Sequence, residues 1–448
     1  MRWIFAGCLV AAALSLLLGG RPTYDPWAWI IWGREITEGN LDTRSGPSWK
    51  PLPMLFTVPF ALAGDDAAPG LWLVVARAGG LLALAMVFRL GARLAGPVAG
   101  VVAVAGVFFS EGFVRHAARG FSEGLLVGLV LLAVDRHLAG QRWAAFTAGL
   151  GAALLRPEVW PFWGLYGLWL GWTDPRARAL VGAGFAAIPL GWFLPEYLGS
   201  GNPLRAAARA LEPNLNSPAF ADRPFLAVLD SSQSVLGAPI YVAALAGVFV
   251  LLGHRRRGSN APEDDLLVML ACGAVLLMIG VGLMTEAGFA GNLRYVVLPA
   301  ALLCLLAGAG VVGVLRALPT RAVAALAGVA MMAAAAPQAQ AELDRFRFEM
   351  REVRSEDDFE RRLRKTIGLV GGPAAVTSCG GVFTSRFQVP AVAWHLHRHQ
   401  RDVEIFPFPP GWTLAPRNSQ LSQDPRFARV AETRKWIVGR NCDGQPSS

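Results

Sequence analysis

Residues 69–96 read PGLWLVVARAGGLLALAMVFRLGARLAG, and this stretch decides the class of fold. From Gly70 to Phe88 it is apolar except for Arg77, and about 20 helical residues span a hydrocarbon core of roughly 30 Å. Similar runs recur along the 448 residues, 54% of which are hydrophobic, with a mean hydropathy of +0.42. We therefore expect an α-helical polytopic membrane protein of about 11 transmembrane helices. The predicted spans are residues 3–20, 70–89, 95–111, 121–136, 143–155, 157–172, 179–195, 237–253, 266–284, 295–315 and 322–340.

The basic residues predict the orientation of these spans. The formal net charge is +9, but short loops between apolar runs carry many of the cations, which is typical of membrane topology and argues against nucleic acid as a partner. We expect a multi-pass plasma (inner) membrane protein with a cytoplasmic N-terminus, a first helix that is retained, and an extracytoplasmic C-terminus. The outer loops are then residues 21–69, 112–120 and 196–236. The cytoplasmic cations are Arg89, Arg93, Arg136, Arg142, Arg176, Arg178, the run His254-Arg255-Arg256-Arg257, Arg316 and Arg321.

The chain after residue 341 differs in composition from the rest. The segments after residue 341 predict, in order, a charged helix from residue 342, a strand at AAVTSCGG (374–381), a helix at VPAVAWHLHRHQ (389–400) and a strand at VEIFPF (403–408). We expect residues 1–341 to form the transmembrane domain and residues 342–448 a small extracytoplasmic α/β domain.

Two sets of side chains in this C-terminal region leave alternatives. Cys379 and Cys442 either pair as a disulfide in an oxidising compartment or stay as two free thiols. His395, His397 and His399 alternate along the chain, which favours a surface cluster over a metal site on one helix face.

Cations also accumulate on the predicted outer side. A charge near the membrane is unfavourable unless it is paired or faces a wet cavity, and the planar fork of Arg suits phosphate. Any one of these cations alone snorkels to the interface or pairs with an acid more often than it binds a ligand. Several that converge predict an anionic ligand. They are Arg34, Arg44, Lys50, Arg77, Arg115, Arg119, Arg156 and Arg294.

The stretch YDPWAWIIWGREI, residues 24–36, has two interpretations. In the first, Asp25 is an N-cap followed by Pro at the first helical position, and the three Trp residues anchor the helix along the bilayer surface. In the second, Asp25 is a catalytic acid on the outer face. Local sequence alone favours the cap.

The order of motifs over residues 24–96 resembles the N-terminal part of the GT-C superfamily glycosyltransferases, in the group of protein O-mannosyltransferases and lipid A aminoarabinose transferases. Those enzymes carry an acid at the head of the first outer loop, then E-M…G, K-P-P-L, A-R-L and R-R-L-F-G. The matching residues here are Asp25, Glu35-Ile36 with Gly39, Lys50-Pro51-Leu52-Pro53, Ala76-Arg77 and Arg93-Leu94-Ala95-Gly96.

Weaker similarity extends to about residue 315. It lies in ARGFSEGLLVGLVLLAV, with Arg119 and Glu123, in LGAALLRPEVWPF, with Arg156, and in NLRYVVLPAALLCLLAG, with Arg294 and Tyr295. The chain departs from the pattern at Asp25-Pro26, where Asp-Glu is commoner, and at Glu123, where Asp is usual. The C-terminal region matches no part of the family pattern.

The resemblance implies a GT-C-like fold and transfer of a sugar from a polyprenyl-phosphate donor to a glycan, lipid or protein acceptor of the cell envelope. It implies inversion at the sugar carbon, with Asp25 as general base and cations stabilising the departing phosphate. Those cations are Lys50, Arg77, Arg119, Arg156 and Arg294, with Tyr295 beside the last. Glu123 is the second catalytic candidate, and Glu123, Glu35 and His116 either orient Asp25, hold a divalent metal or are only polar groups at the interface. Trp49 is a candidate to orient substrate. No cofactor is otherwise expected.

Two other classes of protein remain open. A transporter or flippase of lipid-linked or anionic substrates would carry its ionisable groups near the bilayer midplane, in matching halves. A non-catalytic envelope assembly protein would need neither the acid nor the converging cations. Whether Asp25, Lys50, Arg119, Arg156 and Arg294 meet at one cavity discriminates between these readings and the transferase.

Overall fold

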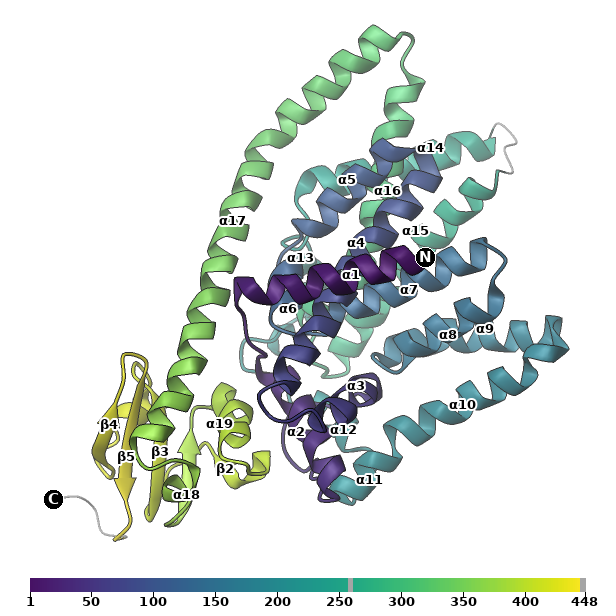
Figure 1. The fold of residues 1–448 in the computed structure, drawn as a ribbon. Helices are drawn as coiled ribbons and strands as arrows, with labels where there is room; N and C mark the ends of the chain where they lie inside the picture. The colour runs from purple at the N-terminus through teal and green to yellow at the C-terminus, as the bar shows by residue number, and fades with distance from the viewer. Residues whose placement is uncertain (257–260, 444–448) are drawn as a thin grey trace.

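The computed structural model describes residues 1–256 and 261–443, so Arg257 of the expected cytoplasmic run lies outside the described residues. Figure 1 shows a helical bundle from which one long helix, α17, leads to a small C-terminal sheet. The helices of the bundle are α1 (Arg2–Ser15), α2 (Tyr24–Glu38), α3 (Pro51–Ala61), α4 (Ala68–Ala95), α5 (Pro97–Phe108), α6 (Phe113–Ala118), α7 (Glu123–Leu138), α8 (Arg142–Ala153), α9 (Trp160–Thr173), α10 (Arg178–Trp192), α11 (Leu194–Ser200), α12 (Arg205–Ala210), α13 (Pro224–Ser232), α14 (Ala238–Arg256), α15 (Pro262–Glu286) and α16 (Val297–Ala317).

Each predicted span coincides with a helix, but the helices differ in length. Among the described residues, six helical segments are long and apolar enough to cross a membrane. The 12-residue helices α5 and α8 reach only about 18 Å. The mostly helical membrane architecture is confirmed, whereas the count of about 11 spans is not. The six segments are Ala68–Ala95, Pro175–Ser200, Ala238–Arg256, Glu263–Glu286, Leu293–Ala317 and Arg321–Leu369.

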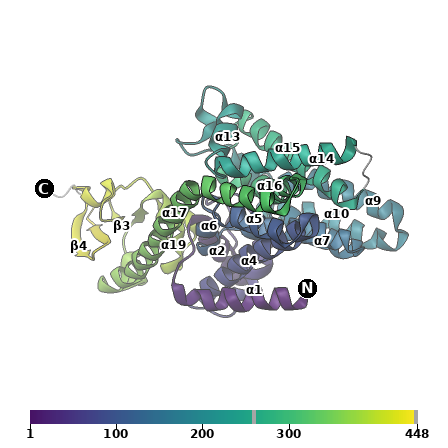
Figure 2. The ribbon, with the colours of Figure 1, turned by 90° about the horizontal axis from the view of Figure 1, so that it is seen from above.

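Glycines set the distance between the two central helices α4 and α7. A Cβ on Gly79 would lie 2.6 Å from the Cα of Leu125, and one on Gly124 would lie 2.8 Å from the Cα of Gly80. Small residues let helix backbones approach this closely in a membrane. The contact fixes the start of α7, where Glu123 is placed. Viewed from above, α1 and the pair α14 and α15 lie at opposite edges of the bundle (Figure 2).

The Trp residues of α2 do not lie at the lipid interface, so that expectation was wrong. Trp27, Trp29 and Trp32 are 2% exposed or less. The ring of Trp29 meets Trp72 of α4 at 5.4 Å edge-on, and that of Trp32 lies 5.4 Å from the ring of Trp49. Other protein segments bury α2 from Asp25 to Glu35, since α3, α4 and α19 pack against it.

Helix α17 (Arg321–Leu369) is 49 residues long and crosses the expected domain boundary at 341/342 without a break. Thr320 caps its first turn, since its hydroxyl accepts a hydrogen bond from the amide of Val323 at 3.2 Å. After it come two short helices and five strands, and within the described residues the strands form one mixed sheet in the order β2-β1-β3-β5-β4. These elements are α18 (Pro373–Val376), β1 (Gly381–Thr384), α19 (Val389–His395), β2 (Val403–Glu404), β3 (Gly411–Pro416), β4 (Ala428–Glu432) and β5 (Trp436–Asn441).

The register of the sheet joins parallel and antiparallel pairs. Strand β1 runs parallel to both β2 and β3, with Val382 opposite Val403 and Trp412. Strand β5 runs antiparallel to β3 and β4. The expected strand at 374–381 was misplaced, because α18 occupies its first half and the strand starts at Gly381. The small C-terminal sheet itself is present as expected.

The side chains whose pairing the sequence left open are also placed. Cys379 and Cys442 form a disulfide with Cα atoms 5.7 Å apart. The three histidines contact three different acids, since His395 lies 3.7 Å from Glu360, His397 lies 2.8 Å from Asp65, and His399 lies 2.8 Å from Glu35. The histidines therefore join the C-terminal region to α17, to the α3–α4 turn and to α2.

Candidate functional site

A cavity of about 620 Å³ opens where the bundle meets α17 and the C-terminal region. Segments far apart in the sequence form its wall, so it depends on the complete fold. Its polar and aromatic lining includes Arg21, Tyr24, Asp25 and Trp27 around the start of α2, Arg115, His116 and Arg119 of α6, Arg209 and Asn214 near α12, Arg294 and Tyr295 before α16, Glu356, Phe359 and Glu360 of α17, and Arg386 and Trp436 of the C-terminal region.

Asp25 lies in the first turn of α2 and is 8% exposed. The helix begins at Tyr24 after Thr23 as the N-cap residue, so the expectation that Asp25 caps the helix was wrong. Its carboxylate instead accepts a hydrogen bond from Arg294 across 269 residues of sequence, with Nη1 and Oδ2 2.6 Å apart.

Lys50 is buried behind this pair as the residue before α3. Its ammonium donates a hydrogen bond to the hydroxyl of Ser122 at 3.0 Å and lies 5.0 Å from the ring of Trp29. Within the described residues, no carboxylate oxygen lies within 4.0 Å of it. Burial, and next the charge of Arg156, lower the pKa of Lys50 to about 7. The ammonium is therefore poised to bind an anion that restores its charge.

Arg156, Glu123 and Tyr295 connect Lys50 with Arg294. Arg156 donates to the Glu123 carboxylate at 2.6 Å, and its guanidinium lies 4.4 Å from the centre of the Tyr295 ring. The guanidinium of Arg294 lies 5.9 Å from the same ring. The second carboxylate oxygen of Glu123 is buried without a hydrogen-bond partner in the described structure. Arg156 and Arg294 thus lie against Tyr295, and the charge of Lys50 interacts with both Arg residues and with Asp25 and Glu123. Asp25, Arg119 and Arg294 line the cavity, whereas Lys50, Glu123 and Arg156 are buried outside its lining.

Arg115, His116 and Arg119 line the cavity, and the two Arg side chains form ion pairs with acids of α17. Arg119 pairs with Glu356 of α17 at 2.6 Å, and Arg115 pairs with Glu352 at 3.3 Å. Burial lowers the pKa of His116 to about 4, so its imidazole is neutral at pH 7. Because Arg119 pairs with Glu356, we regard it as a residue that joins the end of α6 to α17 at the edge of the cavity.

Arg77, Glu35 and Trp49 lie outside the cavity lining. Arg77 donates to the carbonyls of Ser15, Gly19 and Ala118 at 2.7 to 3.0 Å, which closes the turn after α1. Glu35 accepts from the amide of Asp42 at 2.9 Å and contacts His399. The indole of Trp49 donates to the carbonyl of Gly191 at 2.9 Å. These three residues hold the fold around the site, so they are left out of the site proposed below.

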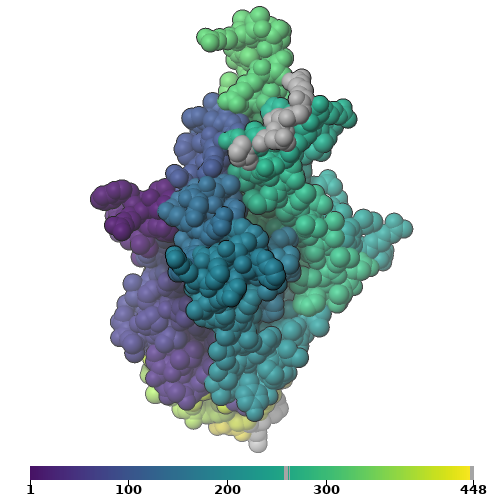
Figure 3. Space-filling model, turned by 90° about the vertical axis from the view of Figure 1, so that its right-hand side faces the viewer, coloured from purple at the N-terminus to yellow at the C-terminus, as the bar shows by residue number. Residues whose placement is uncertain are grey.

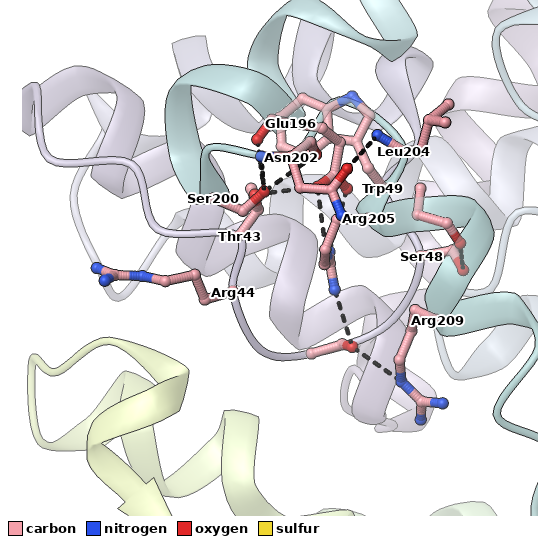
Figure 4. Close-up of polar contacts among 12 residues, drawn as sticks. Thr43, Arg44, Ser48, Trp49, Glu196, Ser200, Asn202, Leu204, Arg205 and Arg209 are labelled. Carbon is pink, nitrogen blue, oxygen red and sulfur yellow. Dashed lines mark hydrogen bonds and ion pairs between the residues drawn. The ribbon is translucent and has the colours of Figure 1, made fainter.

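The segment before Lys50 is held by a buried ion pair (Figure 4). Glu196 is fully buried and takes two hydrogen bonds from Arg205, at 3.0 and 3.1 Å, and one from the hydroxyl of Thr43 at 3.1 Å. Arg205 also donates to the carbonyl of Pro47 at 2.9 Å, and Ser48 donates to that of Ala206 at 2.9 Å. This network fixes both Lys50 and the start of α12, which carries Arg209 into the cavity.

Several site residues were missed by sequence reasoning. The hydroxyl of Ser122 accepts a hydrogen bond from the Lys50 ammonium, and the carboxylate of Glu360 accepts one from the indole of Trp27 at 3.1 Å. Glu360 lies in a stretch of alternating charges whose pattern does not separate a cavity wall from a solvated helix face. Arg386, on the turn before α19, carries no signal in its local sequence.

The side chains present do not fit a bound metal ion. In the described part of the chain, no group of three or more His, Cys, Asp and Glu side chains converges. The chemistry derived below uses no metal.

Comparison with known proteins identifies the architecture. No family model matches the chain, and no curated protein sequence matches it. ArnT from Cupriavidus metallidurans matches in its structure bound to undecaprenyl phosphate, at 12% identity over 98% of this chain and 97% of that one, with a TM-score of 0.55. Its apo structure matches at 14% identity over the same shares, with a TM-score of 0.56.

A third similar structure is the oligosaccharyltransferase AglB from Archaeoglobus fulgidus, at 13% identity over 93% of this chain and 69% of that one, with a TM-score of 0.49. The two ArnT comparisons extend over nearly the full length of both proteins. They confirm, for the fold, the resemblance that the motifs over residues 24–96 suggested. The chain has the fold of the aminoarabinose transferase ArnT, a GT-C glycosyltransferase.

Proposed function

We propose that this protein transfers a sugar from a polyprenyl-phosphate-linked donor to a cell-envelope acceptor on the outer face of the membrane. The donor phosphate binds at Lys50, Arg156 and Arg294, and Asp25 is the general base. The observation that carries the proposal is Lys50, a buried ammonium held by a hydroxyl and an indole face instead of a carboxylate. A buried cation without a counterion is unfavourable unless the functional state supplies one.

The anion is best supplied by a phosphate on a membrane lipid. The cluster has two Arg forks beside Tyr295 and one buried ammonium whose charge interacts with both, and guanidinium groups bind phosphate oxygens bidentately. The cavity lies between the start of the apolar segment Leu293–Ala317 and the polar C-terminal region, so a lipid chain and a polar headgroup can occupy it together. The complex of ArnT with undecaprenyl phosphate is consistent with a lipid of this class.

The ion pair between Asp25 and Arg294 suggests how the base is released. In the ligand-free protein Arg294 neutralises Asp25 at 2.6 Å. When the donor phosphate takes hydrogen bonds from Arg294, the Asp25 carboxylate becomes free to accept the proton of an acceptor hydroxyl. The hydroxyl oxygen then bonds to the sugar carbon on the side opposite the phosphate, and the carbon–oxygen bond to the phosphate breaks with inversion.

The products of this step account for the cations. The proton remains on Asp25, and the bonding electrons leave with the polyprenyl phosphate, which gains a negative charge. Lys50, Arg156 and Arg294 stabilise that charge in a buried site where such stabilisation is strong. The acceptor enters from the opposite wall, formed by α12, α17 and the turn before α19, where Arg209, Glu360 and Arg386 line the cavity.

The test uses purified full-length protein with labelled polyprenyl-phosphate sugars and cell-envelope acceptors. We expect Asp25→Asn to lose transfer by about 10²- to 10⁴-fold, as for removal of a general base, and to retain binding of undecaprenyl phosphate. The matched control is Asp66→Asn, because Asp66 is an exposed carboxylate paired with Arg364. Unchanged transfer by Asp25→Asn would overturn the base assignment. Absence of transfer by the wild type across a broad panel of donors would overturn the proposed activity.

A further inference from the structure

A second cavity, of about 520 Å³, lies at the opposite end of α16 from Arg294. The α4–α5 junction, the end of α16 and the start of α17 form its wall. Most of the residues that line it are apolar, such as Val98, Val312 and Leu315. Two cationic residues, Arg316 and Arg321, also line it. The sugar-transfer site uses none of these residues.

The cavity has an excess of positive charge. Arg316 donates one hydrogen bond to the carbonyl of Ala95 at 2.8 Å, which orients its guanidinium. The side chain of Arg321 is exposed and makes no hydrogen bond or ion pair with the described part of the chain. No Asp or Glu is among the described residues that line the cavity. An anion in this cavity could therefore interact with two Arg side chains, and no carboxylate in the described lining competes for them.

The first half of α17 continues from this cavity as an uncovered apolar surface. Its most apolar 18-residue window is not buried anywhere in the protein, and Leu326, Val329 and Met332 are 58 to 71% exposed. Figure 1 shows this part of α17 standing apart from the bundle, and Figure 3 shows its tip projecting beyond the neighbouring helices. The occupant thus needs a negatively charged head beside long hydrocarbon chains.

We propose that this cavity binds the headgroup of an anionic phospholipid, whose acyl chains lie along the first half of α17. Basic pockets between transmembrane helices bind anionic lipid headgroups in this way. The cavity lies at the end of the bundle where Arg89 and Arg93 also collect, as expected for a cytoplasmic end. A soluble anion would gain nothing from the apolar wall or from the bare helix, whereas a phospholipid uses both.

The experiment measures binding of phosphatidylglycerol and phosphatidylcholine, with identical acyl chains, to the purified full-length protein by native mass spectrometry in a neutral detergent. Each Arg near a membrane surface contributes about 1 kcal/mol to attraction of an anionic lipid, which is about fivefold in affinity. We expect Arg321→Gln to weaken phosphatidylglycerol binding about fivefold and Arg316→Gln/Arg321→Gln about 25-fold. Binding of phosphatidylcholine should be weaker than that of phosphatidylglycerol and unaffected by either change.

The matched control is Arg176→Gln/Arg178→Gln, which removes two Arg residues from the same predicted side at α10. Equal losses in this control, equal binding of the two lipids, or wild-type affinity in the double variant would overturn the proposal. The single Arg321→Gln change removes no contact of the folded protein, so it remains informative if the double variant fails to fold. Lys50→Met should leave phosphatidylglycerol binding unchanged, which separates this site from the one proposed for sugar transfer.

Discussion

Replacing Lys50 by Met should make the ligand-free protein more stable while weakening its binding of a lipid phosphate. Burial lowers the pKa of Lys50 from 10.5 to about 7. At pH 7 the unfolded chain carries a full charge at this position and the folded protein about half. The difference of about 3.5 pKa units at 1.36 kcal/mol each corresponds to a cost of folding of about 4 kcal/mol at pH 7.

The direction of the pH dependence follows from the same shift. Between pH 7 and 10.5 the unfolded chain binds more protons at Lys50 than the folded protein does, so the stability of the wild type rises with pH across this window. Lys50→Met lacks this rise, and its advantage over the wild type is largest at or below pH 7 and vanishes toward pH 10.5. Loss of the hydrogen bond to Ser122 offsets about 1 kcal/mol of the gain.

Thermal unfolding in detergent, followed from pH 6 to 10 with and without undecaprenyl phosphate, measures both effects. Lys50→Met should unfold at a higher temperature than the wild type at pH 7 and should gain less from the lipid. Lys365→Met, which changes an exposed Lys of α17, is the control and should change neither quantity. A lower unfolding temperature for Lys50→Met at pH 7, or an undiminished stabilisation by the lipid, would refute the reasoning.

Three other changes test neighbouring parts of the structure. Glu123→Gln removes the nearer of the two carboxylates that pair with buried Arg156 and leaves Glu158, at 3.7 Å, as its paired acid. Stability should fall by up to about 3–5 kcal/mol; a thermal midpoint equal to that of the wild type would contradict the pairing. Arg77→Gln removes the hydrogen bonds to three partly buried carbonyls and should lower the thermal midpoint of unfolding without changing the affinity for undecaprenyl phosphate. A loss of affinity with an unchanged midpoint would show that Arg77 belongs to the phosphate site. Burial raises the pKa of Glu35 to about 7, so wild-type stability should fall as pH rises from 4.5 through 7. Glu35→Gln should show a smaller fall than the exposed control Glu38→Gln, and equal slopes would exclude Glu35 as the source.

The sequence predicted the helices because apolar runs must be helical in lipid, where each backbone polar group needs an internal partner. It also predicted that cations converge at one cavity; the charges of Lys50, Arg156 and Arg294 do interact, but of these three only Arg294 lines the cavity. Arg77 looked equivalent in its local sequence. What separates it from Arg156 is the position of three carbonyls, two of them about 60 residues away, and sequence spacing carries no information on such a contact.

The Trp residues of α2 show a second limit of sequence reasoning. An indole at the end of a span has the same chemistry whether it faces headgroups or another part of the protein. Here the C-terminal region lies over α2, with the rings of Trp27 and Trp394 5.6 Å apart across 367 positions. The same long-range packing brings Glu360 to the cavity, so local sequence patterns could not predict this part of the cavity wall.

Helix α17 is continuous from its apolar first half to the cavity, so a change in its tilt would move the α17 residues that line the cavity. About 38 residues separate Arg321 from Phe359, a distance of roughly 57 Å along a helix at 1.5 Å per residue. Turning such a rod by about 5° around its membrane end shifts the far end by about 5 Å, which is comparable to the width of a sugar ring. Bilayer thickness, by setting the tilt of α17, would thereby adjust how far Phe359 and Glu360 stand from Asp25.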